Sequence, residues 1–368
     1  MANMNVRTPR FYVDYIQYLL SRGVAQNGNF DVTATGGSGA TATRGLQSGT
    51  EAELFDGRPL NLCSFDTSGD VDSRVLVTMN MQSTGPTQSF IAILNHNLKS
   101  ADGKIRLFAG NEATDVATVN GGAAETADIN WGSATVVNVL NAENGDAASD
   151  SQSYGIKPDA DGTTIIRIGE TGDTTRYWGI QFEGTNGETD VGSVNGTWDG
   201  STDFTVGGIM IGEIYEMPHA PDLNLTRSIV FDKIKMQESL GGQRYGTMTN
   251  HGRTGSSTSK SPFTTSSSDR HLYGGRLVYN MNFSYLASTD VMPDEYHIKD
   301  FDDDAVVEDI WNLTNGPHLP FIFSVDKDSA GANAQSEHIY ARFTQDKLDM
   351  QQVAPDVYNV AMSIEEEF

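Results

Sequence analysis

Acidic residues near the C-terminus have a spacing that suits calcium. Asp326, Asp328, Gly331 and Glu337 occupy positions 1, 3, 6 and 12 of an EF-hand-like loop, in which carboxylate oxygens bind the cation. Position 5, however, is Ala330, and the flanking segments read as strands rather than helices. A hairpin loop is therefore the favoured interpretation, and calcium binding is the alternative.

Two further groups of carboxylates are candidates for a chemical site. The cluster Asp66, Asp70 and Asp72 precedes a clear strand, at a place where jelly-roll domains in some cases hold calcium. Glu213 and Glu216 look like a carboxylate pair, but a spacing of three on a strand puts them on opposite faces. We predict no metal site, while the binding of calcium stays open.

The sequence contains no catalytic motif. It has no phosphate-binding loop, no strand-linked G-x-G-x-x-G, no H-E-x-x-H, no G-x-S-x-G and no C-x-x-C. The seven histidines are scattered, and His96, at a strand end, is expected to make a structural hydrogen bond rather than to line a pocket. Cys63 is the only cysteine, so neither an internal disulfide nor a thiolate metal cluster can form. These observations predict a protein that is not an enzyme and has no cofactor.

Three tryptophans are candidates for contact with a glycan. Aromatic faces stack on sugar rings, and Trp131, Trp178 and Trp198 would do so if they lay in loops at strand ends. The competing interpretation, which we favour, is that all three are core residues.

Four basic residues are candidates for contacts between subunits. They lie in a segment rich in glycine, serine and threonine, and a loop of this length without structure is usually functional or disordered. The four are Arg244, Arg253, Lys260 and Arg270.

The net charge of −25 is spread unevenly over the 368 residues. When Lys and Arg are counted against Asp and Glu, residues 111–220 carry −15 and residues 291–368 carry −13, whereas residues 221–290 carry +3. An acidic surface repels phosphate groups, so binding to duplex nucleic acid is not expected. Solubility explains this charge simply. The alternative is that the basic segment of one copy docks against an acidic domain of a neighbour.

Alternation of apolar and polar residues predicts many short strands. The clearest are Val75–Met81 and Leu277–Tyr285, where every second residue is apolar, and Phe204–Pro218 reads as a buried strand that ends at a proline. Arg10–Arg22 is predicted as a short helix, with a strand left possible, and residues 301–314 as a second helix. The 38 glycines fit an all-β protein rich in turns.

The predicted fold class is mainly β: a jelly-roll or β-sandwich domain followed by a smaller β-rich (α+β) C-terminal module. We expect an N-terminal helix and flexible arm, a β-sandwich, a basic connector and a C-terminal assembly module. Their predicted bounds are residues 1–50, 51–217, 218–275 and 276–368.

The N-terminus shows no targeting signal. Asp14 and Gln17 interrupt the apolar run that a signal peptide would need, and no stretch reaches the roughly 20 apolar residues that span a bilayer. We therefore expect a product made in a cytoplasm, with no insertion into a membrane.

Several segments resemble structural proteins of tailed bacteriophages, especially tail and baseplate components of marine types. They are TPRFYVDYIQYL, SFIAILNHNLKSADGKIRLFAG, TRYWGIQFEG, VGGIMIGEIYEMP, GGRLVYNMNFSYL, PFIFSVDKD, YARFTQDK and YNVAMSIEEEF. The resemblance implies that the predicted sandwich is galactose-binding-like and that a small assembly domain follows it. It brings no catalytic residues.

The leading hypothesis is a non-enzymatic structural component of a tailed-phage virion, in the tail, the baseplate or a fibre attachment. Its expected partners are copies of itself and other virion proteins. The alternative is a carbohydrate-binding adhesion module that recognises a glycan on the host surface. Position in the particle, symmetry and copy number stay open.

Overall fold

The chain folds mainly as antiparallel β-sheet. The structure is a computed structural model that describes residues 7–33, 43–82, 87–117, 128–142, 144–147, 152–169, 175–188, 196–230, 235–247, 276–292, 306–329 and 337–367. Strands make up 47% of it and helices 11%, which confirms the predicted mainly β class.

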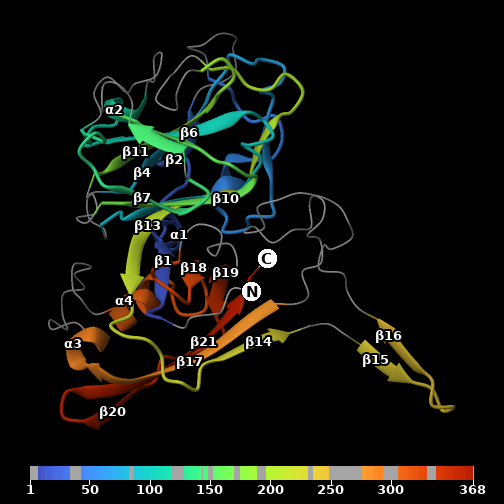
Figure 1. The fold of residues 1–368 in the computed structure, drawn as a ribbon, viewed down its shortest axis with the longest axis vertical. Coiled ribbons are helices and arrows are strands. Elements are labelled where there is room, and N and C mark those ends of the chain that lie inside the picture. Colours follow the sequence, from blue (N-terminus) through green and yellow to red (C-terminus); the bar gives the residue numbers. More distant parts are fainter. Residues whose placement is uncertain are drawn as a thin grey trace.

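One large sheet runs through the whole molecule (Figure 1). Every pair of neighbouring strands in it is antiparallel. In spatial order its strands are β14 (Thr226–Val230), β17 (Arg276–Ala287), β21 (Val357–Glu366), β19 (His338–Phe343), β18 (Phe321–Ser324), β1 (Arg10–Asp14), β13 (Gly208–Glu216), β5 (Phe90–His96), β10 (Gly162–Ile168) and β7 (Val136–Leu140), with β20 (Met350–Ala354) beside β21.

A second sheet covers one end of the large sheet and completes a β-sandwich. It contains β2 (Phe30–Thr33), β4 (Val75–Asn80), β11 (Tyr177–Gly184), β6 (Gly103–Gly110), β9 (Tyr154–Lys157) and β8 (Asn144–Ala147). The inward residues of the two sheets, such as Ile91 and Ile211 on one and Val77 and Ile180 on the other, share one buried core. Burial of these alternating side chains is what holds the two layers together.

Smaller elements complete the described chain. Two strand pairs stand outside the large sheets: β3 (Cys63–Phe65) with β12 (Phe204–Val206), and β15 (Lys235–Glu238) with β16 (Arg244–Thr247). The helical segments are α1 (Tyr15–Ser21), a 3-10 turn (Glu51–Phe55), α2 (Thr114–Ala117), α3 (Ser288–Val291) and α4 (Val306–Leu313).

Strand β1 joins the sandwich to the C-terminal part of the chain. It lies between β13 and β18, and Phe11 pairs with Tyr215 on one side and with Phe323 on the other. The hydrophobic core is correspondingly continuous, because it includes residues of both parts, among them Phe11 and Val307. The large sheet therefore crosses the predicted boundary between residues 217 and 218 without a break.

The segment predicted as a helix from Arg10 to Arg22 is a strand followed by a helix. In β1, Phe11 and Val13 face the main core while Tyr12 belongs to a second cluster on the other face, so the segment has the period of a strand. Asp14 then begins α1, and its side-chain Oδ1 accepts a hydrogen bond from the Ile16 N–H at 3.0 Å.

Strand β17 follows its predicted alternation only as far as Phe283. The pairing with β21 shifts between Phe283 and Leu286, and Tyr285 has a φ of 65°. This β-bulge turns Tyr285 to the surface, where it is 80% exposed, and buries Leu286 instead. The expectation that Tyr285 shares the apolar face was therefore wrong.

Candidate functional site

The three tryptophans lie in the core of the sandwich and not in binding loops. Each is at most 1% exposed. The Trp178 indole N–H donates to the Thr175 carbonyl at 3.0 Å, and that of Trp198 donates to the Ser73 carbonyl at 2.6 Å. Trp131 packs edge-on against Trp178, with ring centroids 6.4 Å apart. Covered on both faces, none of the three can stack on a sugar in this structure, which agrees with the core interpretation.

In each acidic cluster two of the carboxylates form ion pairs with an arginine. Arg7 pairs with Asp326 and Asp328, and Arg44 pairs with Asp66 and Asp70. Among the described residues, no group of three or more His, Cys, Asp or Glu side chains is placed to hold a metal ion.

The loop that carries the EF-hand-like spacing lies partly outside the described residues. This applies to Gly331 and Ala330. Ser329 and Glu337 are the described residues on either side of this part of the loop, and the Ser329 hydroxyl donates to the Glu337 carboxylate. The elements that flank the loop are the strands β18 and β19 rather than helices.

His96 makes the structural hydrogen bonds expected of it. It is buried, its Nε2 lies 2.9 Å from the Thr164 hydroxyl, and its Nδ1 accepts from the Leu98 N–H at 3.3 Å. Burial lowers the pKa of His96 to about 3, so the imidazole is neutral at physiological pH.

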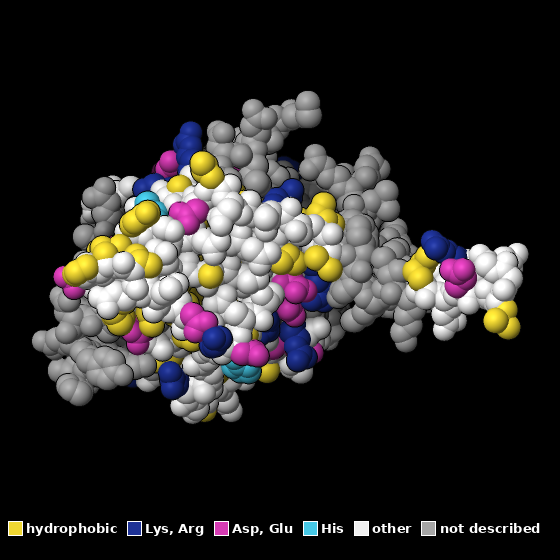
Figure 2. Space-filling model, turned by 90° about the horizontal axis from the view of Figure 1, so that it is seen from below, with side chains coloured by type: hydrophobic (Ala, Val, Ile, Leu, Met, Phe, Trp, Pro, Cys, Tyr) yellow, Lys and Arg dark blue, Asp and Glu magenta, His cyan; other side chains and the backbone are white. Residues whose placement is uncertain are grey.

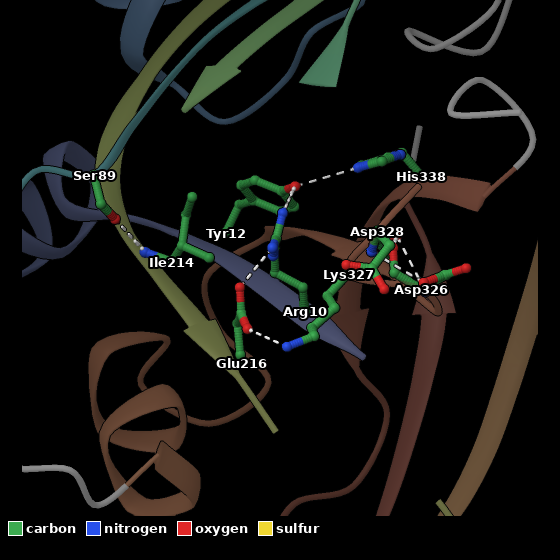
Figure 3. Close-up of polar contacts among 10 residues, drawn as sticks. Arg10, Tyr12, Ser89, Ile214, Glu216, Asp326, Lys327, Asp328 and His338 are labelled. Carbon is green, nitrogen blue, oxygen red and sulfur yellow. Dashed lines mark hydrogen bonds and ion pairs between the residues drawn. The ribbon is translucent and has the colours of Figure 1, made fainter. Parts of the chain in front are cut away.

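A polar cluster at the junction of the two parts of the chain surrounds Arg10 (Figure 3). Its guanidinium bonds Glu216 on β13 at 2.5 Å and the Tyr12 hydroxyl at 3.3 Å, while Lys327, after β18, reaches Glu216 at 3.2 Å. Burial works to raise the pKa of Glu216, but Arg10 and Lys327 outweigh it and hold that pKa below its usual value. The cluster ties β13 to the loop after β18 and is structural.

A buried ionic cluster lies on the outer face of the second sheet. Lys104 and Arg106 of β6 lie beside Glu183 of β11, at 3.2 and 2.9 Å, and Lys104 also bonds Glu188. Arg74 lies 3.6 Å from Glu183. All but Glu188 are at most 2% exposed. In the sequence these charged residues alternate with core residues, a pattern that ordinarily indicates the solvent-exposed face of a strand. The structure instead buries them.

The surface that stands out is the hairpin of β15 and β16, with the neighbouring strand β14. In the described sheets β15 and β16 pair only with each other, and β14 pairs only with β17. The hairpin lies apart from the sandwich in Figure 1, and Figure 2 shows hydrophobic and charged side chains on its surface. Its exposed apolar residues are Met236 (63%), Leu240 (112%) and Tyr245 (58%).

Of the four predicted subunit contacts, only Arg244 lies on this hairpin. It pairs with Glu238 across the strands at 3.3 Å, and both side chains are largely exposed. Arg253, Lys260 and Arg270 lie outside the described residues. The hairpin itself was not predicted, because residues from Gly241 onward read as a loop. In the four residues of β16 the alternation is too short to indicate a strand.

Comparison of the chain with protein-family models, with curated proteins and with solved structures found no match in any of the three. In the described part of the chain, no helix has the length and apolar character to cross a bilayer.

Proposed function

We propose that this protein is a non-enzymatic structural subunit that assembles with other copies of itself through the β14–β16 arm (β14 with the β15–β16 hairpin). The observation that carries this proposal is the hairpin, which projects from the body with Met236, Leu240 and Tyr245 exposed. An isolated two-stranded hairpin is marginally stable in water at best, so a partner that covers these side chains would stabilise it.

Strand β14 adds a second feature of an assembly surface. All five of its residues are exposed, including Ile229 (57%) and Val230 (41%), and it forms one edge of the large sheet. An exposed, apolar edge strand offers free backbone groups to another strand.

Charge indicates that the partner is a second copy of the chain. Residues 221–290, which contain the arm, carry +3, while residues 111–220 and 291–368 carry −15 and −13. Opposite potentials attract and set the orientation of the partners, so the arm of one copy fits the acidic surface of another.

The resemblance to tailed-phage structural proteins supports a place in a virion, as a tail, baseplate or fibre-attachment component. Mass spectrometry of purified particles tests this placement. Absence of the chain from intact particles would contradict it without affecting self-assembly.

The assembly role predicts a large effect of polar substitutions in the hairpin. Met236→Ser/Leu240→Ser/Tyr245→Ser removes apolar surface worth about 1.5–3 kcal/mol per fully buried side chain, so association should weaken at least roughly a hundredfold. Size-exclusion chromatography with light scattering over a concentration series measures this.

Val353→Ser is the matched control, because Val353 is exposed to a similar degree (45%) on β20, away from the arm. It should leave the mass distribution unchanged. A wild-type chain that stays monomeric at every concentration, or a triple variant that assembles like the wild type, would overturn the proposal.

A further inference from the structure

A pocket opens on the outer face of the second sheet, far along the chain from the arm. Its cavity volume is about 180 Å³, and it is lined by residues of the edge strand β2, of its neighbour β4 and of the helix α2. Drug-sized ligands occupy pockets of about 300–1,000 Å³, so this one suits a smaller molecule. We call it the β2–β4 pocket; its polar and aromatic lining is Asn29, Asp31, Thr33, Thr78, Asn80 and Tyr177.

The lining of the pocket includes two hydroxyls on neighbouring strands. Thr33 and Thr78 point outward from β2 and β4, and their hydroxyl oxygens lie 2.8 Å apart. One of the two donates to the other, and each oxygen keeps acceptor capacity, while one hydroxyl proton stays available for a ligand.

A carboxylate and an amide stand beside these hydroxyls. Asp31 accepts from the Gly28 N–H through Oδ1 at 3.0 Å, and its Oδ2 has no hydrogen bond to the described residues. Asn80 is held in place, because it donates to Asn29 at 3.0 Å and accepts from Arg176 Nε at 2.9 Å. The polar groups are therefore oriented before any ligand arrives, which reduces the entropic cost of binding.

Part of the lining is apolar, and its tyrosine, Tyr177, is the cross-strand neighbour of Asn80. Val116 of α2 also belongs to it, and the Arg176 guanidinium lies 4.9 Å from the Tyr177 ring centroid. Asp31 and Arg176 bring one negative and one positive charge to the neighbourhood, which favours a neutral ligand over a strongly charged one.

We propose that the β2–β4 pocket binds a single neutral sugar unit. The hydroxyl, carboxylate and amide groups of the lining match the hydroxyls of a pyranose, and its apolar residues match the C–H face of the sugar. This site is separate from the arm and does not depend on the assembly role. It also differs from the three tryptophans, which are buried.

The test is ligand-observed NMR with a panel of methyl glycosides (gluco, galacto, manno and N-acetylglucosamine types), followed by titration calorimetry of any binder. Thr33→Val/Thr78→Val removes both hydroxyls but keeps the β-branched shape that suits a strand. Loss of two hydrogen bonds should weaken binding roughly tenfold or more. Asp31→Asn, which keeps the acceptor of the Gly28 bond, should weaken it severalfold because a charge-assisted bond is lost.

Thr205→Val is the matched control, since Thr205 is a half-buried strand threonine on β12, outside the pocket. It should bind like the wild type, and thermal unfolding checks that all variants fold. Failure of every glycoside to bind the wild type, or equal binding by the double threonine variant, would overturn the proposal. Neither result would bear on self-assembly through the arm.

Discussion

Replacing Glu183 with glutamine should lower the free energy of unfolding by about 3–5 kcal/mol. Glu183 is the carboxylate on which Arg74, Lys104 and Arg106 converge, with its oxygens between 2.9 and 3.6 Å from their nitrogens. Glutamine keeps the shape but removes the charge, so the three buried cations would lose the carboxylate that all of them approach.

Chemical denaturation measures this loss as a shift of the midpoint at an unchanged slope. The control is Glu365→Gln, which breaks the half-exposed pair of Glu365 with Arg276 on the C-terminal strands. Such surface pairs contribute about 0–1 kcal/mol. If Glu183→Gln cost no more than the control, the ionic cluster would not be the structural element described.

The second large effect concerns Asp14, whose carboxyl begins α1 at the end of β1. It is 3% exposed, and burial raises its pKa to about 8, against the opposing effect of hydrogen bonds from the backbone of Ile16, Ile211 and Gln17. In the unfolded chain its pKa is about 4.

The direction of the pH dependence follows from these two pKa values. Below about pH 4 the carboxyl of Asp14 is protonated in both states and has no effect on stability. Between about pH 4 and pH 8 only the unfolded chain releases the proton, so the free energy of unfolding falls as pH rises. The fall reaches at most about 5 kcal/mol and is complete above about pH 8.

Asp14→Asn should remove this fall, because asparagine caps a helix as well as aspartate but does not ionise. The variant should therefore be more stable than the wild type at pH 8, and the difference should vanish towards pH 4. Urea denaturation across this range measures it. Asp290→Asn, at the start of α3, is the control, since Asp290 caps its helix at the surface, where its carboxylate accepts from the Ala287 N–H. Parallel curves for wild type and Asp14→Asn would contradict a buried neutral carboxyl.

Local pattern predicted most of the strands. Val75, Val77 and Met79 face the core as their alternation indicated, and the helical spacing of Val307, Ile310 and Trp311 appears as α4. Both signals depend only on the geometry of one element, so neighbours along the chain suffice to reveal them. The favoured interpretation of the three tryptophans as core residues also agrees with the structure, in which each is at most 1% exposed.

The pairing of strands that lie far apart in the chain could not be predicted from local pattern. Nothing near Arg10 shows that β1 will lie between β13 and β18, some 200 and 310 residues away. The ionic cluster could not be predicted for the same reason. Alternation indicates that Lys104 and Glu183 lie on the same face of the sheet, but it does not indicate that other parts of the chain bury that face.

The sequence by itself determined that this protein is built of strands, that its charge is concentrated outside the connector, and that it carries no familiar catalytic motif. Only the tertiary structure decided that the two parts share one sheet, that the hairpin projects, and where a pocket forms. The physical reason is that periodicity fixes which way a side chain points, whereas burial depends on which distant segment packs against it.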